Sequence, residues 1–119
     1  MITGVGTDII EVSRIERALA HRDGFAARVF TPAEREYCVS GGNPAQRFAG
    51  RFAAKEAVAK SLGAALSWRD VEILADQAGK PVVRLLNGAA ESAAGRRVIV
   101  SISHCRSYAV AHAIALSDW

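Results

Sequence analysis

The sequence predicts an α+β domain in which helices pack on one face of a mainly antiparallel sheet. Two observations predict this class. Apolar residues recur at spacings of three and four in the first half of the chain, as on a helix, and they alternate near its end, as on a strand. Because 119 residues suit one hydrophobic core, we expect a single domain over residues 1–119.

The chain opens on a predicted strand that leads into a helix. Residues 1–8 are apolar and contain Gly4 and Gly6, which is typical of a strand that a ligand can approach closely. Asp8 and Glu11 have the spacing of a capping box, so we expect Asp8 to cap the following helix. The apolar stripe of that helix consists of Val12, Ile15 and Leu19.

Two further helices are predicted before the middle of the chain. Thr31 can cap a helix that has Pro32 at its first position. After a glycine-containing loop, residues 45–62 form the longest predicted helix, which is rich in alanine. Gly63 is placed to end it.

The second half of the chain predicts strands. The expected elements are strands at 71–74 and 81–86, a short helix at 87–94, and a final strand pair at 97–103 and 108–116. One face of the last strand carries only alanine, at positions 109, 111, 113 and 115. Such a face allows a helix or another subunit to approach closely.

Composition excludes several classes of protein. Hydrophobic residues make up 50% and charged residues 23%, which excludes a disordered chain or a disulfide-dense scaffold. The net charge of +3 is too small to predict nucleic-acid binding. Cys38 and Cys105 lack metal-type spacing, so we expect reduced thiols in a cytoplasmic protein. We also expect no signal peptide and no membrane association, since no apolar run approaches 18 residues.

Two acidic residues are the first candidates for chemistry. Lys55 and Glu56 flank the face of the long helix that carries Phe52, whereas a plain surface helix places charges opposite its aromatic residues. Mg²⁺ prefers oxygen ligands, and Asp8 and Glu56 would suffice for such a site. Each has an ordinary alternative: Asp8 as a helix cap alone, and Glu56 as one half of a surface ion pair with Lys60.

His104 is a further candidate, because it lies in the predicted turn between the last two strands. Its ordinary alternative is a surface residue of a hairpin. His112 shares a strand face with Val110 and Ile114, so we expect it to be buried or at an interface. The sequence contains no P-loop, nucleophile elbow or zinc-protease helix, and Gly4 and Gly6 lack the third glycine of a dinucleotide fingerprint.

The order of several short motifs is more specific than any one of them. The two longest are Gly4-Val5-Gly6-Thr7-Asp8 and residues 51–60, Arg-Phe-Ala-Ala-Lys-Glu-Ala-Val-Ala-Lys. Residues 30–34, 79–81 and 100–104 add support at matching places. From about residue 2 to residue 116, the chain resembles the holo-[acyl-carrier-protein] synthase family, the small phosphopantetheinyl transferases.

The resemblance implies a reaction, its cofactors and its partners. The reaction is the transfer of 4′-phosphopantetheine from coenzyme A to a serine of apo acyl carrier protein, with release of adenosine 3′,5′-bisphosphate. The resemblance also implies Mg²⁺, held by Asp8 and Glu56 together with the coenzyme A pyrophosphate and water. Finally, it implies a homotrimer with active sites between subunits, and a role in fatty acid biosynthesis.

The same resemblance assigns roles to individual residues. It implies catalytic roles for Asp8, Glu56 and Lys60. It implies contacts with coenzyme A for Arg51, Lys60, Gly63, Pro81 and His104. Two positions depart from the family pattern: Ala59 stands where serine is common, which removes a hydroxyl near the phosphates, and Cys105 stands where threonine is frequent.

The first helix carries a basic side that suits docking of the carrier protein. Its residues are Arg14, Arg17, His21 and Arg22. Acyl carrier proteins present an acidic helix beside the modified serine, so a basic helix is complementary to it. The ordinary alternative is a solvated helix face.

A binding module without catalysis is the alternative function. A small basic α+β domain could bind RNA or a regulatory ligand, but a sheet that binds RNA needs exposed aromatic residues for stacking. Here the predicted strands offer only Tyr108. A trimer whose catalytic site has decayed is a second alternative, and the presence of Asp8, Glu56 and Lys60 argues against it.

Overall fold

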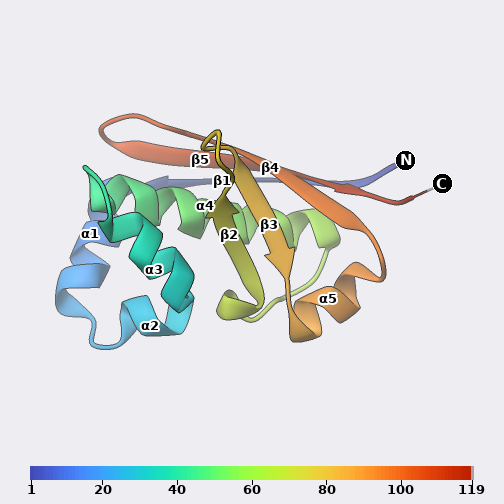
Figure 1. The fold of residues 1–119 in the computed structure, drawn as a ribbon, viewed down its shortest axis with the longest axis horizontal. Coiled ribbons are helices and arrows are strands. Elements are labelled where there is room, and N and C mark those ends of the chain that lie inside the picture. Colours follow the sequence, from blue (N-terminus) through green and yellow to red (C-terminus); the bar gives the residue numbers. More distant parts are fainter. Residues whose placement is uncertain (119) are drawn as a thin grey trace.

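A long helix crosses one face of a three-stranded sheet, and the other helices lie beyond it (Figure 1). The computed structural model describes residues 1–118. The helix is α4 (Pro44–Leu62), and the strands are β1 (Ile2–Glu11), β5 (Tyr108–Leu116) and β4 (Arg97–His104), in that spatial order. Both pairings are antiparallel. The predicted α+β class is confirmed.

Small residues let α4 lie directly on the sheet. The four alanines of β5, at 109, 111, 113 and 115, are fully buried and face the helix. In β1, an added Cβ at Gly4 or Gly6 would collide with the backbone carbonyl of Ser61 or Ala57 in α4. The close approach predicted for the alanine face is therefore made by a helix of the same chain, and β1 takes part in it through its glycines.

The outer face of the sheet is apolar and exposed. Val5 and Ile9 of β1 and Ile99 of β4 are each at least 50% exposed. Thr7 and His112 face outward between them, and Thr7 Oγ1 lies 2.9 Å from His112 Nδ1. The expectation that His112 is buried is wrong for the single chain, and its place in an interface between subunits stays a prediction.

Two groups of smaller elements lie side by side along the other side of α4 (Figure 1). Three helices follow β1 in the chain: α1 (Val12–His21), α2 (Phe25–Val29) and α3 (Pro32–Val39). After α4, the chain forms a 3₁₀ turn (Trp68–Asp70), the antiparallel hairpin of β2 (Val71–Ala75) and β3 (Pro81–Leu85), and then α5 (Asn87–Ala93). The predicted elements are present with ends shifted by a few residues, and α2 was not predicted.

The capping box predicted at Asp8 is wrong. Asp8 lies within β1, opposite Ala111 of β5, and β1 continues to Glu11 before α1 begins at Val12. Glu11 occupies the N-cap without a capping hydrogen bond from its side chain. The pairing with β5, more than a hundred residues away in the chain, outweighs the local capping pattern.

The cap predicted at the start of α3 is confirmed. Thr31 accepts a hydrogen bond from the Glu34 backbone N–H, and the Glu34 side chain accepts one from the Thr31 N–H. Pro32 stands at the first helical position. The two reciprocal bonds satisfy N–H groups that a helix start otherwise leaves open.

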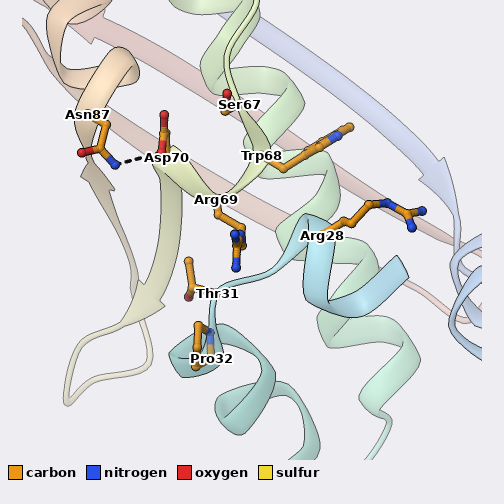
Figure 2. A pocket seen from close by; sticks show the side chains of 8 residues that line it. All are labelled: Arg28, Thr31, Pro32, Ser67, Trp68, Arg69, Asp70 and Asn87. Atoms are coloured by element: carbon orange, nitrogen blue, oxygen red, sulfur yellow. Dashed lines mark hydrogen bonds between the residues drawn. The ribbon is translucent and has the colours of Figure 1, made fainter. Parts of the chain in front are cut away.

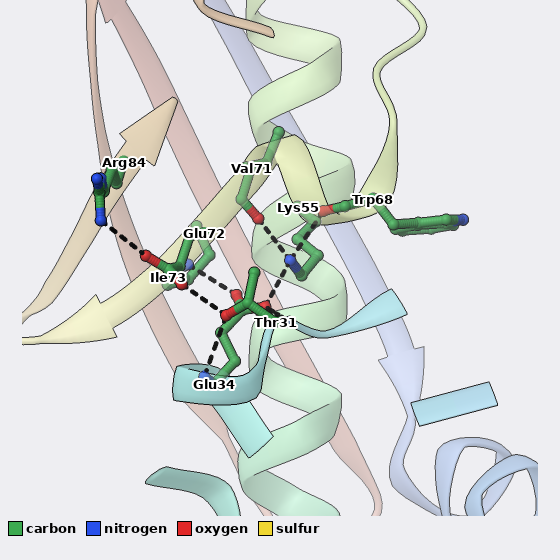
Figure 3. Close-up of polar contacts among 8 residues, drawn as sticks. All are labelled: Thr31, Glu34, Lys55, Trp68, Val71, Glu72, Ile73 and Arg84. Carbon is green, nitrogen blue, oxygen red and sulfur yellow. Dashed lines mark hydrogen bonds and ion pairs between the residues drawn. The ribbon is translucent and has the colours of Figure 1, made fainter. Parts of the chain in front are cut away.

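A buried ion pair joins α4 to α3 and β2 (Figure 3). Lys55 Nζ lies 2.8 Å from Glu34 Oε1, and both side chains are almost fully buried. The ammonium also donates to the carbonyls of Trp68 and Val71, while the Ile73 N–H donates to Glu34 Oε2. Burial lowers the pKa of Lys55, and the Glu34 carboxylate opposes that effect. Lys55 therefore lies inside the fold, although the sequence pattern placed it with Glu56 at the flank of the face that carries Phe52.

Candidate active site

Asp8 and Glu56 line one pocket of about 310 Å³ between β1, α1 and α4. Even-numbered residues of β1 face α4, which turns Asp8 toward the helix that carries Glu56. The rest of the lining is apolar or basic: Ile9, Ile10, Arg14, Ile15, Ala18, Arg22, Phe25 and Phe52. Two residues 48 positions apart in the sequence thus line one pocket, and their role as metal ligands stays a prediction.

Lys60 joins this site from the next turn of α4. Its ammonium donates to the Thr7 carbonyl at 2.9 Å and lies 3.3 Å from Asp8 Oδ1. The Lys60 side chain is 53% exposed and that of Asp8 is 17% exposed. The ordinary alternative of a Glu56–Lys60 surface pair is not what the structure has, because the ion pair of Lys60 is with Asp8. Its ammonium remains open to solvent for an anionic ligand.

A second, shallower pocket of about 460 Å³ adjoins the first through Glu56. Lys60 and Gly63 line it together with Ala59, Ala64, Ala65, Leu66 and Trp68. Gly63 has a left-handed backbone (φ +66°), which ends α4 and turns the chain along the pocket. Predicted residues Glu56, Lys60 and Gly63 therefore lie on one continuous surface.

The donor set at this site fits a magnesium ion. Two carboxylates reach the same pocket, and Mg²⁺ is typically held by one or two carboxylates, with water and substrate phosphates completing its octahedron. Within residues 1–118, no group of three or more His, Cys, Asp or Glu side chains is placed to hold a metal. Water and substrate phosphates would therefore have to complete the coordination of a metal held by these two carboxylates.

The other three predicted coenzyme-binding residues form a separate pocket of about 250 Å³. Arg51, Pro81 and His104 come from α4, β3 and the end of β4. The remaining lining is Tyr37, Gln46, Arg47, Gly50, Gly79 and Ile102, with no acidic side chain. An excess of cationic and polar groups makes this pocket suited to an anion.

Sequence reasoning missed Tyr37 and Arg47 in this pocket. Arg47 stands one helical turn before Arg51, a spacing that places both on one side of α4 and that the sequence could have revealed. Tyr37 comes from α3, and no local pattern ties it to α4. Only the packing of the two helices brings it there.

The two sites lie on different sides of α4. At about 100° per residue, Arg51 is rotated by about 140° from Glu56 and by about 180° from Lys60. The pocket lined by Arg51 shares no residue with either pocket lined by Glu56. Within one chain, the cationic pocket and the carboxylates are therefore separate.

The basic side of α1 is only partly turned toward the carboxylates. Arg14 and Arg22 line the pocket of Asp8 and Glu56, and the Arg22 guanidinium lies 5.7 Å from the centre of the Phe25 ring. Arg17 and His21 are exposed on the surface of α1 outside that pocket. The four predicted residues thus form a basic surface that begins at the rim of the site.

A further hollow in the surface lies elsewhere (Figure 2). It is an open hollow of about 730 Å³ whose lining is Arg28, Thr31, Pro32, Ser67, Trp68, Arg69, Asp70 and Asn87. Asn87 donates to Asp70 Oδ1 at 3.1 Å within it. None of the predicted site residues takes part, so we assign no chemistry to this hollow.

The two cysteines are free and differ in environment. Burial raises the pKa of Cys38 to about 11, although the nearby Arg51 lowers it in part. Cys105 is exposed at the β4–β5 turn, where backbone hydrogen bonds at Ser107 and Tyr108 lower its pKa. In the structure the two thiols are not joined to each other, and their reduced state in a cytoplasmic protein stays a prediction.

Comparison with known proteins shows the family of this chain. The family model described as the 4′-phosphopantetheinyl transferase superfamily matches residues 4–113. The holo-[acyl-carrier-protein] synthase of Alkaliphilus metalliredigens is 49% identical, with 97% of this chain and 99% of that protein covered. The corresponding protein of Moorella thermoacetica is 47% identical, with 96% and 94% covered.

Solved structures give the same result. The holo-(acyl-carrier-protein) synthase of Bacillus anthracis, in complex with CoA (3′,5′-ADP), has a TM-score of 0.84 and 37% identity, with 99% of each chain covered. The holo-ACP-synthase of Plasmodium yoelii has a TM-score of 0.88 and 35% identity, with 99% of this chain and 97% of that one covered. This chain belongs to the 4′-phosphopantetheinyl transferase superfamily.

Proposed function

We infer that this chain transfers the 4′-phosphopantetheine group of coenzyme A to a serine of an apo acyl carrier protein. The observation that carries this inference is the 49% identity to a holo-[acyl-carrier-protein] synthase over 97% of this chain. In addition, Asp8 and Glu56 of this chain line one pocket. The chain is thus a transferase with coenzyme A as co-substrate. A binding module without catalysis has no comparable support.

The reaction exchanges one bond at phosphorus. The serine oxygen bonds to the phosphorus that carries pantetheine, the anhydride P–O bond breaks, and adenosine 3′,5′-bisphosphate leaves with the electron pair. The serine proton passes to an acceptor, for which Glu56 acting through water is our candidate. No covalent intermediate with the enzyme is needed, which agrees with a pocket that holds no cysteine or serine.

We propose that Asp8 and Glu56 hold Mg²⁺, with the coenzyme A pyrophosphate and water as the remaining ligands. When bound, the metal would neutralise the pyrophosphate and so allow the hydroxyl to approach. Lys60, already anchored by the Thr7 carbonyl and Asp8, directs its ammonium to the same place. A positioned charge of this kind contributes about 2–4 kcal/mol to transition-state stabilisation.

We also propose that the nucleotide end of coenzyme A occupies the pocket of Arg51, Pro81 and His104. The separation of this pocket from the carboxylates supports a homotrimer in which one chain supplies the cationic pocket and its neighbour supplies Asp8 and Glu56. The exposed apolar outer face of the sheet offers a surface for that assembly.

The carrier protein would dock on the basic residues of α1. Arg14 supports this proposal best, because it lies both on that helix and on the rim of the carboxylate pocket. We further propose one domain over residues 1–119 and a cytoplasmic location, which two free thiols fit. Among residues 1–118, no helix is both long and apolar enough to cross a bilayer.

Intact-mass spectrometry tests the function directly. Apo acyl carrier protein incubated with this protein, coenzyme A and Mg²⁺ should gain the mass of one phosphopantetheine group. EDTA should abolish the gain, and excess Mg²⁺ should restore it. A mass gain that persists in EDTA would refute the metal role alone, whereas no gain with several different carriers would overturn the proposed transfer.

A further inference from the structure

Two arginines of α4 lie against one aromatic ring of α3. The guanidinium carbon of Arg51 is 4.3 Å from the centre of the Tyr37 ring, and that of Arg47 is 4.8 Å from it. All three residues line the cationic pocket. A tyrosine ring attracts guanidinium groups through its negative face, so one ring holds two like charges close together.

Arg47 is fixed from a second direction. Its Nη1 donates to the Tyr37 carbonyl at 3.0 Å, at the end of α3. Gly41 makes room for it, since a Cβ at that position would collide with the Arg47 guanidinium. Arg47 is therefore held by both the ring and the backbone carbonyl of Tyr37.

Arg51 is the more buried of the two and is incompletely bonded. Only 7% of it is exposed, and its Nε has no hydrogen-bond partner among the described residues. A buried donor without a partner is costly, and the pocket offers no carboxylate to satisfy it. These features point to an anionic ligand that completes the arrangement.

We propose that Tyr37 is a positioning residue that orients Arg47 and Arg51 toward the terminal 3′-phosphate of coenzyme A. The inference rests on the proposed function, which places the pyrophosphate at Asp8 and Glu56 and leaves this phosphomonoester as the anion for the cationic pocket. Two fixed guanidinium groups match the oxygens of a phosphate dianion. Tyr37 thereby sets the preference for coenzyme A over 3′-dephospho-coenzyme A.

Steady-state kinetics with these two substrates test the role of Tyr37. Tyr37→Leu removes the ring, so we expect the KM for coenzyme A to rise about tenfold, with little change in kcat or in the KM for the dephospho form. Tyr37→Phe keeps the ring and should retain the wild-type preference. Arg47→Gln should reproduce the effect of Tyr37→Leu, and Arg69→Gln, outside the pocket, should not.

A binding measurement separates this inference from the proposed function. In calorimetry, wild type should bind adenosine 3′,5′-bisphosphate more tightly than adenosine 5′-phosphate, and Tyr37→Leu and Arg47→Gln should each lose most of that difference. Normal transfer with undiminished preference in both variants would overturn the role of Tyr37 and leave the transferase intact. Absence of bisphosphate binding by wild type would overturn both. A structural defect would instead raise both KM values equally.

Discussion

The carboxylate of Asp8 is preoriented by Lys60 before any substrate arrives. A charge-assisted contact at 3.3 Å, with the Thr7 carbonyl as second acceptor, fixes the ammonium between the strand and the helix. A metal that binds Asp8 therefore meets a carboxylate already turned toward the pocket. In the proposed metal site, Glu56, one turn earlier on α4, would supply the second oxygen donor.

Replacement of Glu56 by glutamine should remove metal-dependent activity without unfolding the chain. The amide keeps the volume and loses the negative charge, so we expect transfer to slow by about 10²–10³-fold. The rate is measured by intact mass, Mg²⁺ affinity by titration, and folding by thermal denaturation. Glu91→Gln on the exposed face of α5 is the matched control, and wild-type turnover in Glu56→Gln would disprove the ligand role.

Charge reversal at Arg14 should separate the two substrates. Arg14→Glu repels an acidic helix, so the KM for the carrier protein should rise far more than the KM for coenzyme A. Both constants come from initial rates at varied carrier and coenzyme A concentrations. Arg69→Glu, a reversal on another surface, should change neither, and equal increases in both constants for Arg14→Glu would rule out docking on α1.

Contact between β1 and α4 determines where Asp8 lies. The glycines of β1 let the strand approach the helix backbone at Ala57 and Ser61, only a few residues from Glu56 and Lys60. From the other side, the buried Lys55–Glu34 pair ties α4 to α3 and β2. The helix that carries the site is thus held along both sides.

A methyl group at position 6 should disturb that contact. Gly6→Ala drives a Cβ into the Ala57 carbonyl oxygen, and because backbone cannot yield easily, we expect a loss of about 1–3 kcal/mol in the free energy of unfolding. Urea denaturation measures it. Gly42→Ala meets open space and should change stability by less than about 0.5 kcal/mol. Equal stability of the two variants would contradict the close-approach argument.

Local sequence patterns predicted elements well where the decisive contacts are local. The Thr31–Glu34 cap and the alternation of β5 needed only neighbours in sequence. The same reasoning failed at Asp8, because pairing with Ala111 decides its conformation. It also failed at Lys55, whose partner Glu34 comes from another helix.

At the scale of the whole molecule, the candidate site residues divide into two groups on one chain. Asp8, Glu56 and Lys60 gather at one side of α4, while Arg51 and His104 gather at another. The resemblance to a known family supplied this set of residues, and spacing alone could not have assigned them to separate pockets. The division into separate pockets follows from the fold, which places the two groups on different sides of α4.

Mixing two impaired variants tests whether neighbouring chains complete one site. Glu56→Gln and Arg51→Gln should each be strongly impaired alone. If each site combines Arg51 of one chain with Glu56 of its neighbour, an equal mixture of the two variants, refolded together, should contain intact sites. Random assembly places an intact Arg51 beside an intact Glu56 in about a quarter of the sites, so about a quarter of the activity should return. Light scattering should give three times the mass of one chain. No recovery in mixed trimers would place the whole site within one chain.

The pairing of β1 with β5 has a consequence for how the chain folds. The hydrogen-bonded side chains of Thr7 and His112 are 105 positions apart in sequence. Bringing these two strands together costs chain conformational entropy before the contacts between them can form, and this slows folding. During synthesis on the ribosome, β1 emerges first and has no strand to join until β5 follows. Until then, α4 can cover only the face of β1 that carries Gly6 and Ile10, while Val5, Ile9 and the open backbone edge stay exposed.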